Sequence, residues 1–148
     1  MLNKFKKNNN KGFTLVELLV VIAIIGILAV VAVPSLFKNI DKSKAVQVTT
    51  NINAIKTEIM SNYADGITYA DMVDASKDYK KAILNIVPET EIKAGESYDI
   101  TALENNAGIA ITVKTEAGDS NVLGRVAKQF GEQIDDTATN SVTIDVTN

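Results

Sequence analysis

An uncharged stretch of sixteen residues, 18–33, constrains this chain more than any other feature of its sequence. It reads LLVVIAIIGILAVVAV, and it is preceded by FTLV at 13–16 and by the single acid Glu17. Together with Leu36 and Phe37 the apolar segment reaches about 25 positions, whereas a helix that spans a membrane needs roughly 20. The segment therefore predicts a membrane-spanning helix with one carboxylate at its leading edge.

The free energy of insertion favours the membrane in spite of Glu17. Each Leu, Ile or Val adds about −0.3 to −0.6 kcal/mol, so those of residues 18–33 contribute roughly −4 to −7 kcal/mol. One acid costs about +2.5 to +3.5 kcal/mol at the helix centre and less toward the end. Residues 1–12 hold four lysines and no acid, and the remainder holds 11 basic and 18 acidic residues. Because positive charge stays in the cytoplasm, the C-terminal part is predicted to lie outside.

Two simpler interpretations of the apolar segment remain open. One is a secretory signal peptide cleaved near Val30-Val31-Ala32, although the run is longer than a usual signal core and Glu17 interrupts its start. The other is a plain signal anchor in which Glu17 is incidental. Neither interpretation explains the spacing of Gly12, Phe13 and Glu17.

The composition excludes several classes of function. The chain has no Cys and no His, which excludes thiol chemistry, disulfides, the usual zinc sites and histidine-dependent catalysis. The acidic balance beyond residue 12 argues against nucleic-acid contact by the head, because such contact requires clustered basic side chains. We therefore predict no catalytic residue, no cofactor and no metal site.

The residues that lead into the apolar segment form a motif. Lys11-Gly12-Phe13-Thr14-Leu15-Val16-Glu17, followed by the unbroken apolar run, resembles the processing motif of type IV prepilins. It resembles equally the motif of the pseudopilins of type II secretion and competence systems. The match covers about residues 4–40 without a departure, and beyond residue 40 the resemblance is one of architecture only.

This resemblance implies a maturation pathway. A membrane prepilin peptidase recognises a leader that includes Lys7 and Lys11, cuts between Gly12 and Phe13, and N-methylates Phe13. The mature chain waits in the cytoplasmic membrane with its N-terminus inside, until an assembly platform and its ATPase extract it into a filament. The implied parts are a cleaved basic leader at 1–12, a transmembrane and filament-core helix at 13–37, and an extracytoplasmic head at 38–148.

The function that the resemblance implies is that of a structural subunit, not an enzyme. The chain would polymerise with its own copies into a type IV pilus, a surface fibre of the kind used in twitching motility and cell adhesion. A pseudopilin of a type II secretion or DNA-uptake system is the alternative. A third class, a membrane-anchored exported enzyme or binding module, would need a pocket of convergent polar groups that the sequence does not indicate. The absence of Cys favours a Gram-positive source, because many Gram-negative pilins close their heads with a disulfide.

Phe13, Thr14 and Glu17 are the expected assembly residues. Gly12 has no side chain, so the backbone there can enter a narrow protease cleft. Cleavage creates one new charge, the Phe13 amine, which is expected to meet Glu17 of a neighbouring subunit. Two charges about 4 Å apart attract by roughly 4 kcal/mol at an effective dielectric near 20. An unpaired carboxylate in an apolar core costs several kcal/mol, so Glu17 is expected to set subunit register.

Gly26 and Pro34 are the expected points of helix flexibility. They bracket a stretch that loses regular structure in some assembled pili of the family that this chain resembles. Pro34 removes a backbone donor and clashes with the carbonyl of Val30, which favours a kink. Gly26 weakens its own turn by about 1 kcal/mol relative to Ala. The alternative is that Gly26 permits close helix packing and that Pro34 marks the outer membrane boundary.

Beyond Pro34 the helix is predicted to continue as an amphipathic half that ends near YADG at 63–66. Its apolar positions recur at helical spacing, with Asn51 and other polar residues on the opposite face. The expected inward positions are Ala45, Val48, Ile52, Ile55 and Ile59.

The remaining elements predict an α+β head. One helix is expected over 69–87, capped by Thr68 and Asp71 and ended by Pro88. A second is expected over 122–134, with Leu123, Val126, Phe130 and Ile134 facing inward. Alternating residues predict strands at 98–102, 109–113 and 142–146, which form an antiparallel sheet of at least three strands against the long helix.

Several acidic side chains raise the question of a cation site. Asp71, Asp74 and Asp78 share one side of the expected 69–87 helix, but Lys77 and Lys81 lie among them. The loops at 115–121 and 134–140 match no defined calcium motif. The aspartates of these two loops are Asp119, Asp135 and Asp136. We interpret all of these acids as solvated surface.

Overall fold

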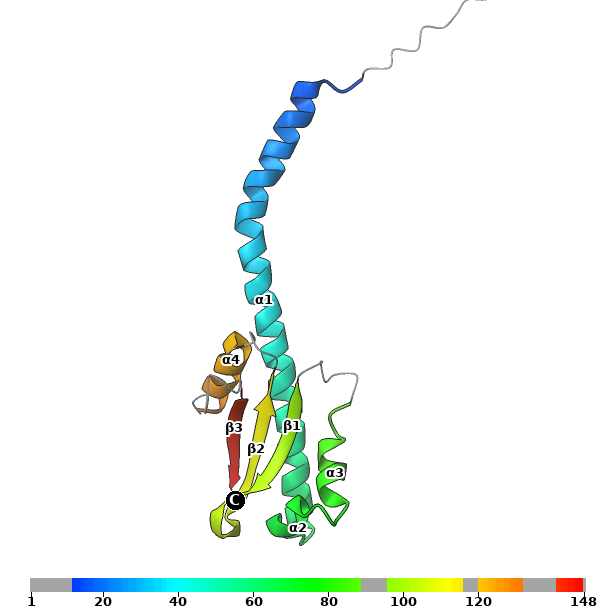
Figure 1. Ribbon diagram of the computed structural model, residues 1–148, viewed down its shortest axis with the longest axis vertical. Coiled ribbons are helices and arrows are strands. Elements are labelled where there is room, and N and C mark those ends of the chain that lie inside the picture. Colours follow the sequence, from blue (N-terminus) through cyan, green and yellow to red (C-terminus); the bar gives the residue numbers. More distant parts are fainter. Residues whose placement is uncertain (1–11, 89–95, 116–119, 132–140, 148) are drawn as a thin grey trace, which may run out of the picture. The chain divides into compact units, whose positions relative to one another are not determined.

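One helix, α1, spans Leu15–Ala64 and contains 50 of the 148 residues of the chain (Figure 1). The computed structural model describes residues 12–88, 96–115, 120–131 and 141–147. The chain divides into two compact units, Met1–Lys38 and Asn39–Asn148, and α1 contributes to both. The predicted single long helix is therefore confirmed.

The C-terminus of α1 is closed by glycine at the predicted place. Gly66 adopts φ +88°, a left-handed conformation that glycine enters without steric cost. The Gly66 amide donates to the carbonyl of Tyr63 and the Ile67 amide to that of Asn62, each at 3.0 Å. These two bonds form a Schellman motif, which satisfies carbonyls that the helix itself leaves free.

Gly26 and Pro34 both lie inside α1, which continues through them as helix. The structure describes a single chain, whereas the expected loss of helix concerns subunits in an assembled fibre. The flexibility of this stretch therefore stays a prediction.

The second half of α1 packs one face onto the head. The predicted inward residues are all buried: Ala45, Val48, Ile52, Ile55 and Ile59. The expectation that Asn51 lies on the solvent face is wrong, because its side chain is only 4% exposed. Its amide donates to the Tyr98 hydroxyl at 3.1 Å, and this hydrogen bond offsets the desolvation of a buried amide.

The head contains an antiparallel sheet in the order β1-β2-β3. The strands are β1, Ser97–Ala102, β2, Gly108–Lys114, and β3, Ser141–Thr147. A 3₁₀ turn, η1, at Glu104–Asn106 joins the first two, and both Asn105 and Asn106 have positive φ. The three predicted strands and their antiparallel pairing are confirmed.

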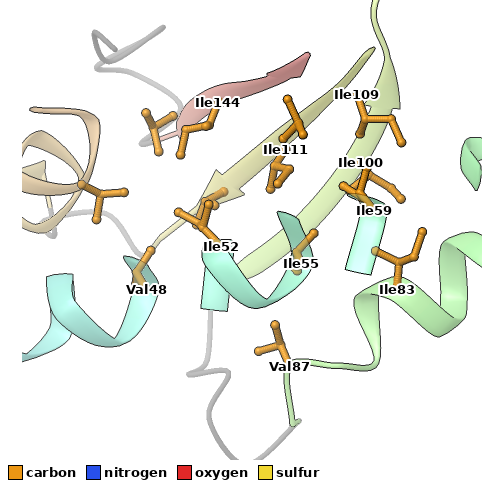
Figure 2. Close-up of a cluster of buried hydrophobic side chains, with 14 of the residues drawn as sticks. Val48, Ile52, Ile55, Ile59, Ile83, Val87, Ile100, Ile109, Ile111 and Ile144 are labelled. Carbon is orange, nitrogen blue, oxygen red and sulfur yellow. The ribbon is translucent and has the colours of Figure 1, made fainter. Parts of the chain in front are cut away.

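The register of the sheet aligns one apolar row across all three strands. Ile100 pairs with Ile111, which in turn pairs with Ile144. All three are at most 2% exposed and face the buried stripe of α1, as Figure 2 shows for Ile52 and Ile55. Burying one such side chain stabilises the fold by roughly 1.5–3 kcal/mol. The α+β head is thus a helix-on-sheet layer.

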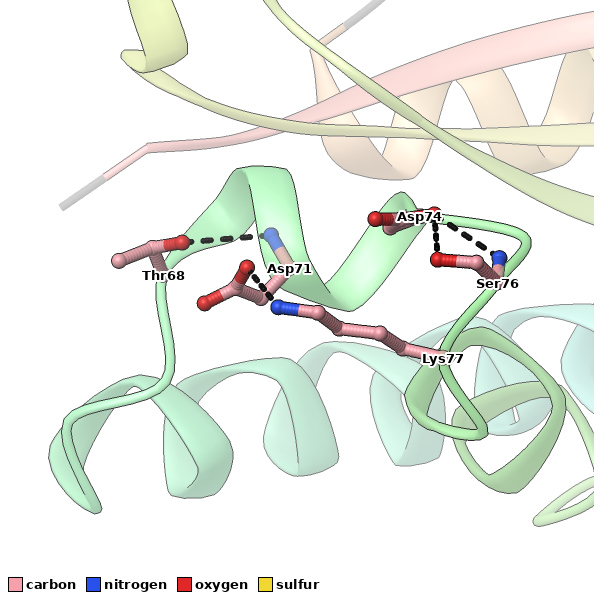
Figure 3. Close-up of polar contacts among 5 residues, drawn as sticks. All are labelled: Thr68, Asp71, Asp74, Ser76 and Lys77. Atoms are coloured by element: carbon pink, nitrogen blue, oxygen red, sulfur yellow. Dashed lines mark hydrogen bonds and ion pairs between the residues drawn. The ribbon is translucent and has the colours of Figure 1, made fainter.

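The expected helix over 69–87 is in fact two short helices, α2 at Tyr69–Val73 and α3 at Tyr79–Leu84. The break has a local cause: one Asp74 carboxylate oxygen accepts from the Ser76 amide at 2.8 Å and from its hydroxyl at 2.7 Å (Figure 3). Such an Asp-centred turn competes with the helical hydrogen bonds. The expected cap is confirmed, because the Thr68 hydroxyl accepts from the Asp71 amide at 3.2 Å.

The last helix, α4, spans Ser120–Phe130, so the expected end at residue 134 is wrong. Gly131 follows at φ +77°, and a left-handed glycine directly after a helix ends it. Leu123 and Val126 are buried as expected, and Phe130 is half-buried. Ile134 lies outside the described residues, as do Asp119, Asp135 and Asp136.

Candidate functional site

The start of α1 is held by a reciprocal pair of side chains. Thr14 donates to Glu17 Oε2 twice, from its amide at 2.9 Å and from its hydroxyl at 2.8 Å. In return the Glu17 amide donates to Thr14 Oγ1 at 3.2 Å. This is a capping box, in which two residues three apart satisfy donors that the first helical turn leaves free.

The capping box lowers the free-energy cost of placing the Glu17 carboxylate beside an apolar segment. Its carboxylate lies in the first turn of α1, where the positive end of the helix dipole favours an anion. Both hydrogen bonds from Thr14 reach Oε2, and no described residue donates to Oε1. Glu17 is therefore partly compensated within its own chain and keeps one oxygen available for an external donor.

The expected cleavage position precedes the helix and is accessible. Phe13 is 90% exposed, and Gly12 is also exposed. A Cβ built on Gly12 would meet no described atom within 4 Å, so the fold of this chain does not itself require glycine there. A requirement for glycine at this position would have to come from outside the chain. Lys7 and Lys11 lie outside the described residues, so their role in leader recognition stays a prediction.

Among residues 12–38, which the structure describes, the large apolar side chains have no partner surface within their unit. Their exposed fractions run from 46% for Val33 to 90% for Phe13. By length and composition α1 is able to cross a membrane, and none of its most apolar window is buried. Such a surface is stable only when lipid or other apolar helices cover it.

The rest of the described chain offers no comparable cluster of chemically active groups. Within residues 12–88, 96–115, 120–131 and 141–147, no three acidic side chains come together in a way that could hold a metal ion. Of the three acids that share the 69–78 segment, Asp71 pairs with Lys77 and Asp74 is used by its turn (Figure 3). The Lys77 ammonium, as the main cause, holds the pKa of the Asp71 carboxyl below its usual range.

The expectation that Thr14 and Glu17 act in assembly does not include a contact between them within one chain. The signal was present, because a threonine followed three residues later by an acid and then by an apolar run is a capping box pattern. Sequence reasoning placed Thr14 and Glu17 together as assembly residues, and the structure shows that they are in direct contact.

Comparison with known proteins gives a consistent set of relatives. The family model described as "Prokaryotic N-terminal methylation motif" matches residues 7–33, a range that includes Gly12, Phe13 and Glu17. The chain is 36% identical over 103 residues to a "Fimbrial protein" of Moraxella nonliquefaciens, covering 70% of this chain and 60% of the relative. It is 33% identical over 115 residues to the "Type IV major fimbrial protein FimA" of Dichelobacter nodosus, covering 78% and 63%.

A third relative shares a shorter region. The "Type IV major pilin protein PilA" of Myxococcus xanthus is 42% identical over 65 residues, which is 44% of this chain and 30% of the relative. The chain thus spans less than two thirds of the length of each of these relatives. No solved structure matches the chain significantly. The expected Gram-positive source finds no support in these comparisons.

Proposed function

Because the chain belongs to the type IV pilin family, we propose that it is the structural subunit of a type IV pilus. It is made as a prepilin, cut by a prepilin peptidase between Gly12 and Phe13, and N-methylated on Phe13. The mature chain then polymerises with its own copies into a surface filament. The names of the relatives are those of fibre proteins, and the proposal therefore prefers a pilus to a secretion or DNA-uptake pseudopilin.

The proposal rests on one observation: Glu17 is hydrogen-bonded by Thr14 through one carboxylate oxygen, and it lies at the start of an apolar helix that no described residue of its own unit covers. Before assembly, Thr14 and the helix dipole offset part of the cost of placing this carboxylate at the membrane edge. After cleavage, the Phe13 amine of one subunit meets the free Oε1 of Glu17 in the next. In an apolar filament core a misplaced subunit leaves both charges unpaired, which costs several kcal/mol.

The proposal divides the chain by task. Residues 1–12 are the leader, 13–37 cross the membrane and later form the filament core, and 38–148 form the head outside the cell. The peptidase, an assembly platform and its ATPase are the partners, and the membrane holds the subunit before extraction. The proposal assigns the chain no catalytic activity of its own.

Two variants of Glu17 separate its two roles. Glu17→Val removes both the charge and the cap, whereas Glu17→Gln keeps an oxygen that can accept from Thr14 and removes only the charge. Both are expected to insert in the membrane and to be processed, because loss of the acid lowers the cost of insertion by up to about 3 kcal/mol. Neither is expected to build abundant filaments, because the Phe13 amine then lacks a counter-charge.

The measurement is electron microscopy of filaments sheared from cells, with mass spectrometry of the subunit N-terminus. The native chain should start at methylated Phe13 and appear in long surface fibres. Abundant fibres from Glu17→Gln subunits would show that assembly does not require the ion pair between the Phe13 amine and Glu17 of the next subunit. Fibre subunits that retain residues 1–12 would overturn the processing step, and processed native chains that never leave the membrane would favour a pseudopilin.

A further inference from the structure

A shallow groove runs between α1 and α4 within the unit Asn39–Asn148. The hydroxyl of Thr49 on α1 donates to Gln129 Oε1 on α4 at 3.2 Å and holds the two helices together beside it. The groove has a volume of about 320 Å³. Its lining residues are Lys42, Ala45 and Val46 of α1 with Arg125, Lys128 and Gln129 of α4.

The groove is basic in a head that is otherwise acidic. Its described lining holds three cations and no acid, whereas residues 39–148 as a whole hold 10 basic and 17 acidic residues. Among the described residues, no carboxylate forms an ion pair with Lys42, Arg125 or Lys128. By contrast, Lys77 and Lys80 are paired with acids of the head. Three unpaired cations of the described head therefore line one groove, whereas the other unpaired lysines, Lys56, Lys81 and Lys114, lie outside it.

The floor of the groove is apolar. The Val46 side chain is 56% exposed, and Ala45 beside it is 6% exposed. Cations around an exposed aliphatic side chain suit a ligand that carries an anionic phosphate next to a glycerol or acyl portion. A nucleic acid or a free phosphate would use the cations but leave Val46 uncovered.

One side of the groove lies close in sequence to the membrane segment, and therefore close to membrane lipids. Lys42 lies only five positions after Phe37, the last apolar residue of the membrane segment. Because α1 is helical over this link, the link spans only about 7.5 Å along the helix. Electrostatic attraction falls off over about 8–10 Å at physiological salt. Whatever angle the head adopts, the groove cannot move far from the membrane surface while the chain waits there.

We propose that this groove binds the headgroup of an anionic phospholipid at the outer surface of the cytoplasmic membrane. The inference rests on the proposed function, because it needs the membrane-inserted subunit. The remaining acidic surface of the head is repelled by anionic lipid, so contact through this groove also selects one orientation of the head. Release of the lipid is then part of extracting the subunit into a fibre.

The electrostatic attraction between the groove and an anionic membrane is expected to be modest, but it is sufficient to orient a tethered head. Each Lys or Arg near an anionic surface favours contact by roughly fivefold, so three cations give about 100-fold. The head is tethered to the membrane by its own helix, so it meets lipid headgroups at a high effective concentration and needs no high affinity. High salt should weaken it, because the cations are exposed.

The absence of cysteine allows a direct test with the full chain. Asn121→Cys places a unique thiol on an exposed position of α4, one turn before Arg125, where it is labelled with a fluorophore. The chain is inserted in phosphatidylcholine vesicles with or without phosphatidylglycerol, both containing a lipid with a nitroxide quencher on its headgroup. We expect phosphatidylglycerol to increase quenching at least about twofold, since the three cations then hold the head at the surface.

Two triple variants of equal charge change make the test specific. Lys42→Gln/Arg125→Gln/Lys128→Gln should lose the increase in quenching. Lys56→Gln/Lys81→Gln/Lys114→Gln removes three lysines outside the groove and should keep it. Circular dichroism of both variants checks that the head is folded, and resistance to carbonate extraction checks that the chain is inserted.

The outcomes are distinct. If the native chain inserts but phosphatidylglycerol does not increase its quenching, the inference is overturned and the proposed function is unaffected. Equal loss in both triple variants also overturns it, because net charge and not the groove would then be responsible. Release by inorganic phosphate at constant ionic strength would indicate a free-anion site, and quenching that follows the protein-to-lipid ratio would indicate contact between copies. Failure of the native chain to insert would overturn the proposed function and this inference together.

Discussion

Gly108, the first residue of β2, lies where the adjacent strand leaves no room for a side chain. A Cβ at this position would lie 2.2 Å from the carbonyl oxygen of Val146 and 3.2 Å from Leu103 Cδ1. Gly108→Ala should therefore push β2 and β3 apart and lower the free energy of unfolding by about 1–3 kcal/mol. Urea denaturation of the chain in mild detergent measures this loss.

A second variant tests the reason for that loss. Leu103→Ala removes the flexible neighbour of Gly108 but leaves the carbonyl of Val146 in place. The double variant Leu103→Ala/Gly108→Ala should therefore remain destabilised. Recovery of native stability would show that the side chain of Leu103, and not the backbone of β3, limits the space.

The ion pair between Asp71 and Lys77 makes stability depend on pH at the acidic end. The ammonium of Lys77, followed by Thr68, lowers the pKa of Asp71 in the folded chain. The unfolded chain then binds the proton more readily, so this contribution is complete above the unfolded pKa of Asp71. It is lost as the pH falls through the folded pKa. Asp71→Asn should weaken the fold slightly at neutral pH and make no difference once Asp71 is protonated.

Asp78→Asn is the matched control for this experiment, because it removes the same charge. Asp78 makes no side-chain cap bond at the start of α3. Denaturation curves recorded at several pH values should show a flatter acid limb for Asp71→Asn only. An equal change in both variants would assign the pH dependence to the general charge of the segment.

At the scale of elements, the sequence predicts what periodicity alone determines. The apolar stripe from Val48 to Ile59 recurs every three or four residues over several turns, and the three strands alternate in residues that are mostly β-branched. A periodic pattern that extends over several turns or a whole strand still indicates the element when one residue departs from it. The long helix, the three strands and the apolar residues of the buried face of α1 could therefore be predicted, whereas the buried polar residues Thr49 and Asn51 could not.

The two wrong helix predictions depend on single residues that outweigh periodicity. Asp74 closes a turn with Ser76, and Gly131 takes up a left-handed conformation. An aspartate is usually tolerated in a helical pattern, so the sequence of residues 69–87 gives no sign of the break. The burial of Asn51 was equally hidden, because its partner Tyr98 is far away in the sequence.

The candidate site could be predicted more completely than the head, for a related reason. Gly12, Phe13 and Glu17 lie within a few consecutive residues, so their placement depends on local sequence and not on tertiary packing. The α1–α4 groove is the opposite case. Lys42 and Arg125 line the same groove because Leu123 and Val126 pack α4 against the core, and no local sequence pattern shows this packing.

At the scale of the whole molecule, burial and exposure are separated along the sequence. Every buried residue that the structure describes lies at position 45 or beyond, whereas the large apolar residues from Phe13 to Phe37 are all exposed. Folding of the head and covering of the apolar helix are therefore separate processes. This separation suits a subunit that exchanges lipid for other copies of itself without unfolding its head.

The same separation predicts that residues 39–148 fold without the membrane segment. The fragment retains the whole described core, and it begins at Asn39, a residue type that caps helix N-termini well. It should be soluble and unfold cooperatively in urea, as followed by circular dichroism. Within it, Ile52→Ala should cost about 2–5 kcal/mol because Ile52 is completely buried. Met60→Ala, at a half-exposed position of the same helix, should stay within about 0.5 kcal/mol. An unfolded fragment would mean that the head depends on residues 13–38, and equal costs for the two variants would place the core elsewhere.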